Sequence, residues 1–345
     1  METVEHLIVG AGPAGLRAGQ VLAEAGREAL VAEKRAEIGP KTCAGGLTPK
    51  TADLLRGLGL PEHAGLRRVG HVAFAAESSV MLDPERTTIV TLSRRELGAY
   101  QSAWTRAAGT DVRAGCSVRE LDLVRRTALV GGHRIRWRHL IGADGSDSAV
   151  RRSLGLPSPR VYFAAEYNLP NLRLEPLRVE CDRALGGGYF WVFPHTDYTS
   201  VGAVAPKHLV RPALVRSYLD ARLRALEVGA PGVPLEGATL EVDFRGLHFP
   251  GGVHLAGDAA GVPSALTAEG IYSALITGED VARGLLDPAY RSARVGRWLR
   301  VKRRHDRLAV FLRRPSARAA TLSVLGRLAR WRVARGPMAD WFLAG

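Results

Sequence analysis

The chain has 345 residues, 46% hydrophobic and 24% charged, which excludes a disordered protein and fits two modest domains or one large α/β unit. Its apolar runs are far shorter than the roughly 20 residues of a membrane-spanning helix, its start lacks a signal peptide's basic segment, and its three cysteines indicate a reducing cytoplasm with no disulfide framework or metal site. The net charge of +14 fits nucleic acid, an anionic membrane or acidic ligands equally well.

The N-terminal residues predict a strand–helix–strand unit. An apolar run over residues 6–9 predicts a strand, and apolar positions at helical spacing predict a helix over residues 13–25. Gly26 ends this helix, because glycine tolerates positive φ. Residues 29–32 predict a second buried strand. This order implies a parallel sheet.

The chain then leaves this sheet and returns to it. The remaining segments predict, in chain order, a loop-rich region at 37–70, strands at 71–92, a helix at 97–108, short strands at 112–141, mainly strands at 158–246 around a helix at 209–226, strand–loop–helix at 253–286, and arginine-rich helices over the last 55 residues. The return to the first sheet predicts a discontinuous domain with another domain inserted into it.

A glycine-rich turn lies between the first predicted strand and helix, as Gly10-Ala11-Gly12-Pro13-Ala14-Gly15. In a dinucleotide-binding turn, Gly10 permits the tight bend, Gly12 lets the backbone approach a pyrophosphate, and Gly15 allows close packing of the helix. The helix N-terminus offers unpaired N–H groups to the phosphate. Glu33 lies 18 residues after Gly15, where its carboxylate can accept both ribose hydroxyls and would repel a 2′-phosphate. An ordinary glycine-rich turn is the alternative that this context disfavours.

Two later segments carry a resemblance to a known superfamily. Residues 142–151 (GADGSDSAVR) and 255–261 (LAGDAAG) each follow a predicted apolar strand. Together with the glycine turn they resemble, in order and spacing, the FAD-dependent oxidoreductases of the p-hydroxybenzoate hydroxylase and geranylgeranyl reductase superfamily, over about residues 4–285. The resemblance implies that FAD is the bound nucleotide and that Asp258 contacts its ribityl and pyrophosphate region.

Further FAD contacts follow from the resemblance. The helix N-terminus at Gly270 and Ile271 can stabilise negative charge on a reduced flavin ring. Arg94 resembles the family's arginine that reaches FAD from the start of a helix, and Arg95 is the competing candidate.

The predicted fold is therefore α/β. We expect a discontinuous Rossmann-like FAD-binding domain, an inserted antiparallel-sheet substrate domain and a helical C-terminal segment. The expected boundaries are 1–70, 93–157 and 247–290 for the FAD-binding domain, 71–92 and 158–246 for the substrate domain, and 291–345 for a basic amphipathic helical tail.

Two segments favour the geranylgeranyl reductase branch. Residues 41–48 (KTCAGGLT) resemble its Cys-x-Gly-Gly segment, which the family places near the isoalloxazine ring, and two glycines let a backbone pass close to a planar ring. Cys43 is either beside the flavin or a small buried hydrophobe. Residues 188–194 (GYFWVFP) resemble the branch's Tyr-x-Trp-x-Phe-Pro signature. On a strand, its three aromatic side chains share one face and form an apolar wall for an isoprenoid chain or a ring.

The C-terminal segment carries most of the excess positive charge. Fifteen Lys and Arg residues follow position 290, against two acidic residues. Arginines beside Trp and Leu at helical spacing fit a helix on an anionic membrane surface, through residues 291–335 and on the inner membrane face. The alternative is a solvated helical face packed on the FAD-binding domain. Nucleic acid is not expected, because no nucleic-acid-binding fold accompanies the charge.

The favoured function is an FAD-dependent reductase that saturates carbon–carbon double bonds of a prenyl chain on a lipid, quinone or pigment, with NAD(P)H or another external donor as reductant. Two alternatives stay open: an FAD-dependent monooxygenase of an apolar or aromatic substrate, and a membrane-peripheral electron-transfer flavoprotein. We expect Cys43, Tyr189 and Trp191 at the catalytic centre. The cofactor-binding residues are expected to be Gly10, Gly12, Pro13, Ala14, Gly15, Glu33, Lys34, Cys43, Ala44, Gly45, Gly46, Arg94, Asp144, Gly145, Gly257, Asp258, Gly270 and Ile271.

Overall fold

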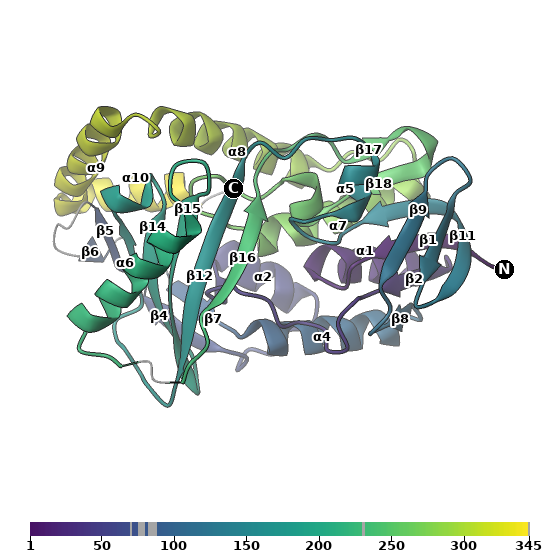
Figure 1. The fold of residues 1–345 in the computed structure, drawn as a ribbon, viewed down its shortest axis with the longest axis horizontal. Coiled ribbons are helices and arrows are strands. Elements are labelled where there is room, and N and C mark those ends of the chain that lie inside the picture. Colours follow the sequence, from purple (N-terminus) through teal and green to yellow (C-terminus); the bar gives the residue numbers. More distant parts are fainter. Residues whose placement is uncertain (70, 75–79, 82–87, 230–231, 344–345) are drawn as a thin grey trace.

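The computed structural model describes residues 1–69, 71–74, 80–81, 88–229 and 232–343. Figure 1 shows an elongated molecule with one large sheet near the N-terminus and a second large sheet towards the other end of the long axis. The C-terminal helices run along one edge and cover part of the second sheet. The mixture of sheets and helices confirms the predicted α/β fold class.

The first sheet has eight strands, and the neighbours along its main path are β17-β18-β11-β1-β2-β8. Strands β1, β2, β8, β11 and β18 run parallel, and β9 and β10 form an antiparallel extension of β11. The strands are β1 (Glu2–Val9), β2 (Ala29–Ala32), β8 (Asp111–Arg113), β9 (Val118–Asp122), β10 (Thr127–Val130), β11 (His133–Gly142), β17 (His248–Phe249) and β18 (Val253–Leu255). The predicted strand–helix–strand unit is confirmed as β1, α1 (Pro13–Glu24) and β2.

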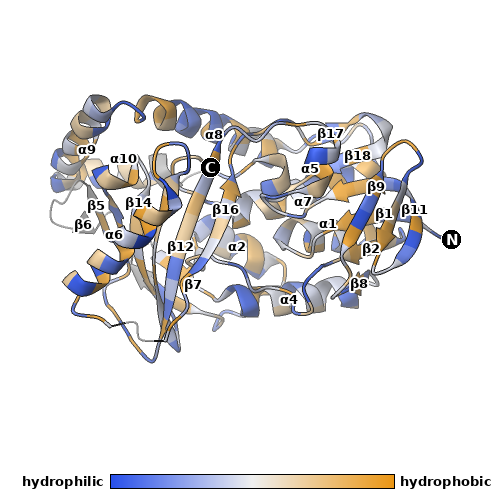
Figure 2. Cartoon of the chain, in the orientation of Figure 1, coloured by the Kyte–Doolittle hydropathy of each residue, from blue (hydrophilic) through white to orange (hydrophobic). Residues whose placement is uncertain are grey.

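Two helices on this sheet pack very closely against each other. They are α1 and α7 (Ile271–Leu286), and a Cβ at Gly278 of α7 would lie 2.2 Å from Ala14 O. Helix α4 (Arg94–Ala107) packs beside α1, where Thr105 donates a hydrogen bond to Leu16 O. Figure 2 shows mainly hydrophobic residues along β2 and β18, as expected for strands covered on both faces, whereas β9 is largely hydrophilic.

The second sheet has seven strands in the order β16-β12-β15-β14-β13-β5-β6. All neighbours are antiparallel except β13 and β5. Helix α6 (Pro212–Ala225) covers one face of this sheet and packs on a core that includes Phe190 and Val192. The strands are β5 (His71–Phe74), β6 (Val80–Met81), β12 (Val161–Pro170), β13 (Arg178–Cys181), β14 (Tyr189–Pro194), β15 (Tyr198–Pro206) and β16 (Glu236–Glu241).

A small third sheet joins the two larger ones. It contains β3 (Gly46–Leu47), β7 (Thr88–Thr91) and β4 (Leu66–Val69), beside helix α2 (Pro49–Gly57). The strands expected over residues 71–92 thus belong to two sheets, and residues 75–79 and 82–87 of that segment lie outside the described residues. The domain boundaries remain a prediction.

The C-terminal segment forms three helices, α8 (Ala293–Phe311), α9 (Pro315–Arg330) and α10 (Arg332–Leu343). Helix α8 is anchored by buried polar side chains. Trp298 Nε1 donates to Val262 O at 3.0 Å, Lys302 Nζ donates to Val242 O at 2.7 Å, and His305 hydrogen-bonds with Ser264 at 2.8 Å. Within the described part of the chain, every helix is too short or too polar to cross a lipid bilayer.

Four histidines form a row across neighbouring strands of the first sheet. His6 of β1 stacks on His139 of β11 at 5.4 Å between ring centroids, and His254 of β18 lies 6.0 Å from His139 and 5.1 Å from His248 of β17. Burial is the main reason why the pKa of each histidine lies below its usual value. The pKa of His254 falls to about 3, because the other three histidines also disfavour its charged form.

The row predicts that acid destabilises the fold. An unfolded histidine takes up a proton near pH 6.5, whereas the folded ones do so only at lower pH, so their contribution to stability is complete above pH 6.5 and is lost as the pH falls below it. For each such histidine, the free energy of unfolding falls by at most about 1.4 kcal/mol for each pH unit of acidification. We expect the free energy of unfolding, measured with urea, to fall between pH 7 and pH 5. His254→Leu should make this fall less steep. An equally steep fall in the variant would contradict a contribution of His254 to the acid sensitivity.

Candidate functional site

A cavity of about 910 Å³ runs from the first sheet to the second. At one end it is lined by residues that follow the carboxyl ends of β1, β2, β11 and β18, which is where open α/β sheets bind ligands. At the other end it is lined by one face of β13 and β14 and by helices α8 and α9. The cavity therefore has a polar crevice and a second part, which we call the apolar arm.

The glycine turn forms the floor of the crevice. Gly10 has φ of +101°, and a Cβ there would lie 2.5 Å from Ala143 O, so no other residue fits. A Cβ at Gly15 would lie 2.0 Å from Gly10 O, whereas a Cβ at Gly12 would meet nothing within 4 Å. Gly12 is the N-cap of α1 and gives the helix no side-chain cap. The open side of Gly12 and the first turn of α1 can therefore receive an anion.

Glu33 connects this turn to strand β2. Its Oε2 accepts a hydrogen bond from the Ala11 N–H at 2.9 Å, and its Oε1 accepts one from the Arg35 N–H at 3.0 Å. Glu33 and the adjacent Lys34 line the cavity. Each carboxylate oxygen keeps a lone pair for a ribose hydroxyl. The contact with Ala11 was not foreseen from the sequence.

Two aspartates lie at the rim of the crevice. Asp144 follows β11, and its Oδ2 accepts from the Ala149 N–H at 2.7 Å, at the start of α5 (Ala149–Ser153). Its Oδ1 is buried without a hydrogen-bond partner among the described residues, and burial raises the pKa of Asp144. Asp258 lies on a short 3-10 turn, Gly257–Ala260, that follows β18. It accepts a 2.6 Å hydrogen bond from Lys41 Nζ. Both aspartates line the cavity, so a polar ligand can reach them.

The structure distinguishes the two arginine candidates. Arg94, the first residue of α4, lines the cavity, and its Nε is buried without a hydrogen-bond partner among the residues described. The Arg95 side chain is 71% exposed and pairs with Glu37 at 3.1 Å. Arg94 is thus the arginine placed to meet a ligand. Across the cavity, Gly270 is the N-cap of α7 without a side-chain cap, and it lines the cavity with Ile271.

The Cys43 loop approaches the cavity from the side of the second sheet. Cys43, Ala44 and Gly46 line the cavity, but Gly45 is absent from its lining. A Cβ at Gly45 would lie 2.6 Å from Leu92 O, and one at Gly46 would lie 2.3 Å from the Phe193 ring. Passage of a planar ring beside these glycines, which the sequence led us to expect, stays a prediction. Glycine is needed here because the loop packs against the protein itself.

Strand β14 supplies an aromatic wall. The side chains of Tyr189, Trp191 and Phe193 line the cavity. Phe190 and Val192, which alternate with them along the strand, face α6. Tyr189 Oη donates to Thr267 O at 2.8 Å, and burial raises the pKa of Tyr189. Trp191 Nε1 donates to Ser200 Oγ at 2.9 Å. Because their polar atoms bond within the protein, these rings present apolar surface to the cavity.

Sequence and structure comparisons identify the family. Residues 3–216 match the FAD binding domain family. The chain is 30% identical over 304 residues to digeranylgeranylglycerophospholipid reductase 1 of Methanopyrus kandleri, covering 79% of this chain and 77% of that one. It is 29% identical over 357 residues to menaquinone reductase of Mycobacterium tuberculosis, covering 90% and 85%. This chain belongs to the geranylgeranyl reductase family of FAD-dependent oxidoreductases.

The fold comparison agrees with this family. A geranylgeranyl bacteriochlorophyll reductase-like protein from Thermoplasma acidophilum superposes with a TM-score of 0.77 at 21% identity, covering 100% of this chain and 97% of that one. The crevice of this family member also fits FAD. Its two uncapped helix N-termini can meet phosphate and ring oxygens, and the unpartnered Asp144 Oδ1 and Arg94 Nε can meet polar groups of the cofactor.

The aromatic wall of the apolar arm was predicted from the sequence, but its aliphatic walls were not. The aliphatic walls include Val179 of β13 and the preceding Leu177, together with four leucines of the C-terminal segment, Leu308, Leu312, Leu322 and Leu325. Leu312, Leu322 and Leu325 recur at helical spacing in the basic tail, for which the sequence left two alternatives, a membrane-facing helix and a helical face packed on the FAD-binding domain. The C-terminal helices are part of the cavity wall, so they are more than an appended tail.

The crevice geometry gives a direct test of phosphate binding. Gly12 has φ of −79°, so Gly12→Asp fits the backbone, and a carboxylate at the N-terminus of α1 favours the apo fold. The same carboxylate would repel a pyrophosphate. We expect Gly12→Asp to weaken FAD binding about 100-fold or more, measured by titrating the apoprotein, without lowering the urea midpoint of the apoprotein. Gly12→Asn is the uncharged control and should lose much less affinity; equal losses would contradict the phosphate assignment.

Proposed function

We propose that this FAD-dependent oxidoreductase reduces carbon–carbon double bonds in the prenyl chain of a lipid, quinone or pigment. The observation that carries this proposal is the apolar arm. None of the described cavity-lining residues on β13, β14, α8 and α9 is charged; they are Val179, Cys181, Tyr189, Trp191, Phe193, Leu308, Leu322 and Leu325. A long apolar channel suits a hydrocarbon chain, whereas a ring substrate needs a compact pocket with polar anchors.

The relatives support the same substrate class. A digeranylgeranylglycerophospholipid reductase and a menaquinone reductase are both named for molecules that carry isoprenoid chains. Their head groups differ greatly, so the prenyl chain is what such substrates share. We therefore assign the arm to the chain and leave the head group outside it.

The proposed chemistry divides the work between cofactor and protein. When bound and reduced, FAD would supply a hydride to one alkene carbon while a proton from solvent or an acidic group reaches the other, and NAD(P)H or another external donor would return two electrons to the flavin. Because an isolated alkene is not polarised, the protein must exclude water and align the bond. Tyr189 and Trp191 form the wall that aligns it, and Cys43 faces them from the loop side. The Tyr189 proton stays on Oη, held towards Thr267 O.

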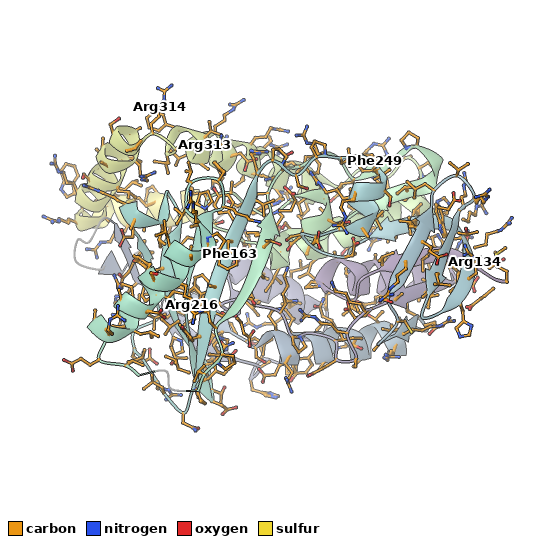
Figure 3. All side chains as sticks on the ribbon, in the orientation of Figure 1. Arg134, Phe163, Arg216, Phe249, Arg313 and Arg314 are labelled. Carbon is orange, nitrogen blue, oxygen red and sulfur yellow. The ribbon has the colours of Figure 1, made fainter. Side chains whose placement is uncertain are left out.

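We also propose that the arm opens towards an anionic membrane on the cytoplasmic side. Helices α8 and α9, which supply the arm's leucines, carry large apolar side chains on their outer side: Phe311 is 50% exposed, Val324 53% and Trp331, the C-cap of α9, 66%. Arg313 and Arg314 lie exposed at the α8–α9 turn, on the outer edge of the molecule (Figure 3). Each arginine near an anionic surface contributes about 1 kcal/mol.

The function is tested by product mass. FAD-loaded enzyme, reduced without oxygen and incubated with geranylgeranyl lipids or quinones, should yield products heavier by about two mass units for each bond reduced. Unchanged masses across several prenyl substrates would refute the proposal. Oxygen-dependent NAD(P)H consumption that rises with substrate would instead identify the monooxygenase alternative.

Two leucines on α9 offer a matched test of the arm. Leu325 lines the cavity, whereas Leu328 is 37% exposed on the outside of the same helix. We expect Leu325→Glu to reduce kcat/KM for a prenyl substrate in detergent at least about tenfold, because a carboxylate in an apolar channel is poorly solvated. Leu328→Glu should leave this value unchanged.

Leu328 and the exposed Trp331 at the end of α9 provide a test of membrane docking. Leu328→Glu combined with Trp331→Glu should weaken sedimentation with vesicles of phosphatidylglycerol, because both changes add negative charge to the exposed face. Equal vesicle binding by wild type and this double variant would contradict membrane docking through the outer face of α9.

A further inference from the structure

A buried glutamate lies in one row with Trp191 of the aromatic wall, and no sequence pattern singles it out. Glu166 of β12 is 1% exposed, and burial raises the pKa of its carboxyl group. Within the described residues, no ion pair reaches it. A carboxylate placed in such a site costs stability unless hydrogen bonds compensate, so its contacts indicate what the fold gains from it.

Glu166 contacts both walls of the proposed reaction site. Its Oε1 accepts a hydrogen bond from the Cys43 N–H at 2.7 Å, and its Oε2 accepts one from Ser200 Oγ at 2.7 Å. Ser200 Oγ in turn accepts from Trp191 Nε1 at 2.9 Å. The Glu166 carboxylate thus links the Cys43 loop to the Trp191 ring. It binds Cys43 N–H directly and reaches Trp191 through the Ser200 hydroxyl.

The sheet register places these groups in one row. Glu166 on β12 and Trp191 on β14 both lie opposite Gly202 of the strand between them, β15. A Cβ at Gly202 would lie 2.1 Å from the Trp191 ring, so the ring occupies the space above this glycine. Ser200 lies two residues away on the same face of β15. Gly202 therefore lets the Trp191 ring lie close to the sheet, and Ser200 and Glu166 set the orientation of the ring.

We infer that Glu166 is a positioning residue for alkene reduction. It sets the distance and angle between the Cys43 loop and Trp191, which lie on the two sides of the cavity where FAD and the prenyl chain must meet. This inference rests on the proposed function. The carboxylate acts through Cys43 N–H and Trp191 and does not line the cavity.

Two conservative variants break the network from opposite ends. Glu166→Gln keeps the volume but has one acceptor oxygen where the carboxylate has two, so Cys43 N–H or Ser200 O–H loses its acceptor. Ser200→Ala removes the group that holds the Trp191 ring. We expect each variant to lower kcat about 10- to 100-fold with little change in KM, because misplacement affects the reacting geometry while the arm still binds the chain.

The network should also be visible without turnover. We expect both variants to change the visible circular dichroism of bound oxidised FAD, and the double variant to lose no more activity than the more affected single variant. The control is Tyr167→Phe on the opposite face of β12, which removes a 2.9 Å hydrogen bond to Asp220 on α6. It should leave kcat and the flavin spectrum unchanged.

The outcomes separate the inference from the proposed function. Wild-type kcat and circular dichroism in folded Glu166→Gln and Ser200→Ala would overturn the inference. So would equal losses in Tyr167→Phe, since they would reflect weaker packing of the sheet. If Glu166→Gln does not fold, Ser200→Ala gives the same test. If wild type reduces no prenyl substrate, the proposed function fails, and the flavin spectra still decide whether Glu166 positions the site.

Discussion

The close contact between Gly10 and the backbone of Ala143 determines the shape of this molecule's centre. A Cβ at Gly10 would lie 2.5 Å from Ala143 O, so the chain can turn sharply between β1 and α1 only with glycine there. This turn brings the carboxyl ends of β1 and β11 together and aims the first N–H groups of α1 into the crevice. Glu33 and Asp144 then lie on either side of one anion-accepting surface, and the rest of the cavity is built outward from it.

The C-terminal helices connect this centre to the outside. Trp298, Lys302 and His305 repeat at helical spacing, and their polar atoms hydrogen-bond to the segment at residues 262–264 or to Val242. The loop that follows contains Thr267, which accepts the Tyr189 hydroxyl. Helix α8 is thus linked to the aromatic wall through a few buried hydrogen bonds. Removing the chain after residue 287 would take away both this support and the arm's leucines, so docking and chemistry share the same helices.

Much of the fold could be predicted from local patterns. The bounds of β2 and of the helix at Ile271–Leu286 follow from apolar runs that end at glycine or charged residues. Helix α4 begins at Arg94, three residues earlier than expected, because Ser93 and Glu96 form a capping box that the apolar spacing did not reveal. The glycine turn and the two aspartate segments were recognisable because their residue types and spacing are constrained by the backbone itself.

The contacts that complete the site could not be predicted in this way. Glu166 lies 123 residues from Cys43 in the chain, and Lys41 lies 217 residues from Asp258. Periodicity shows that a residue is buried but not which distant residue it meets, and a lone acidic residue in a strand gives no signal of its partner. The leucines of α8 and α9 were visible as a stripe, but their assignment to the cavity needed the tertiary fold.

A crystal structure of the FAD-loaded protein would test the central claim most directly. The account predicts that the pyrophosphate lies against the first turn of α1 at Gly12 and that the isoalloxazine ring lies between the Cys43 loop and Trp191, facing the apolar arm. An isoalloxazine ring placed away from Trp191, or separated from the arm by protein, would contradict it.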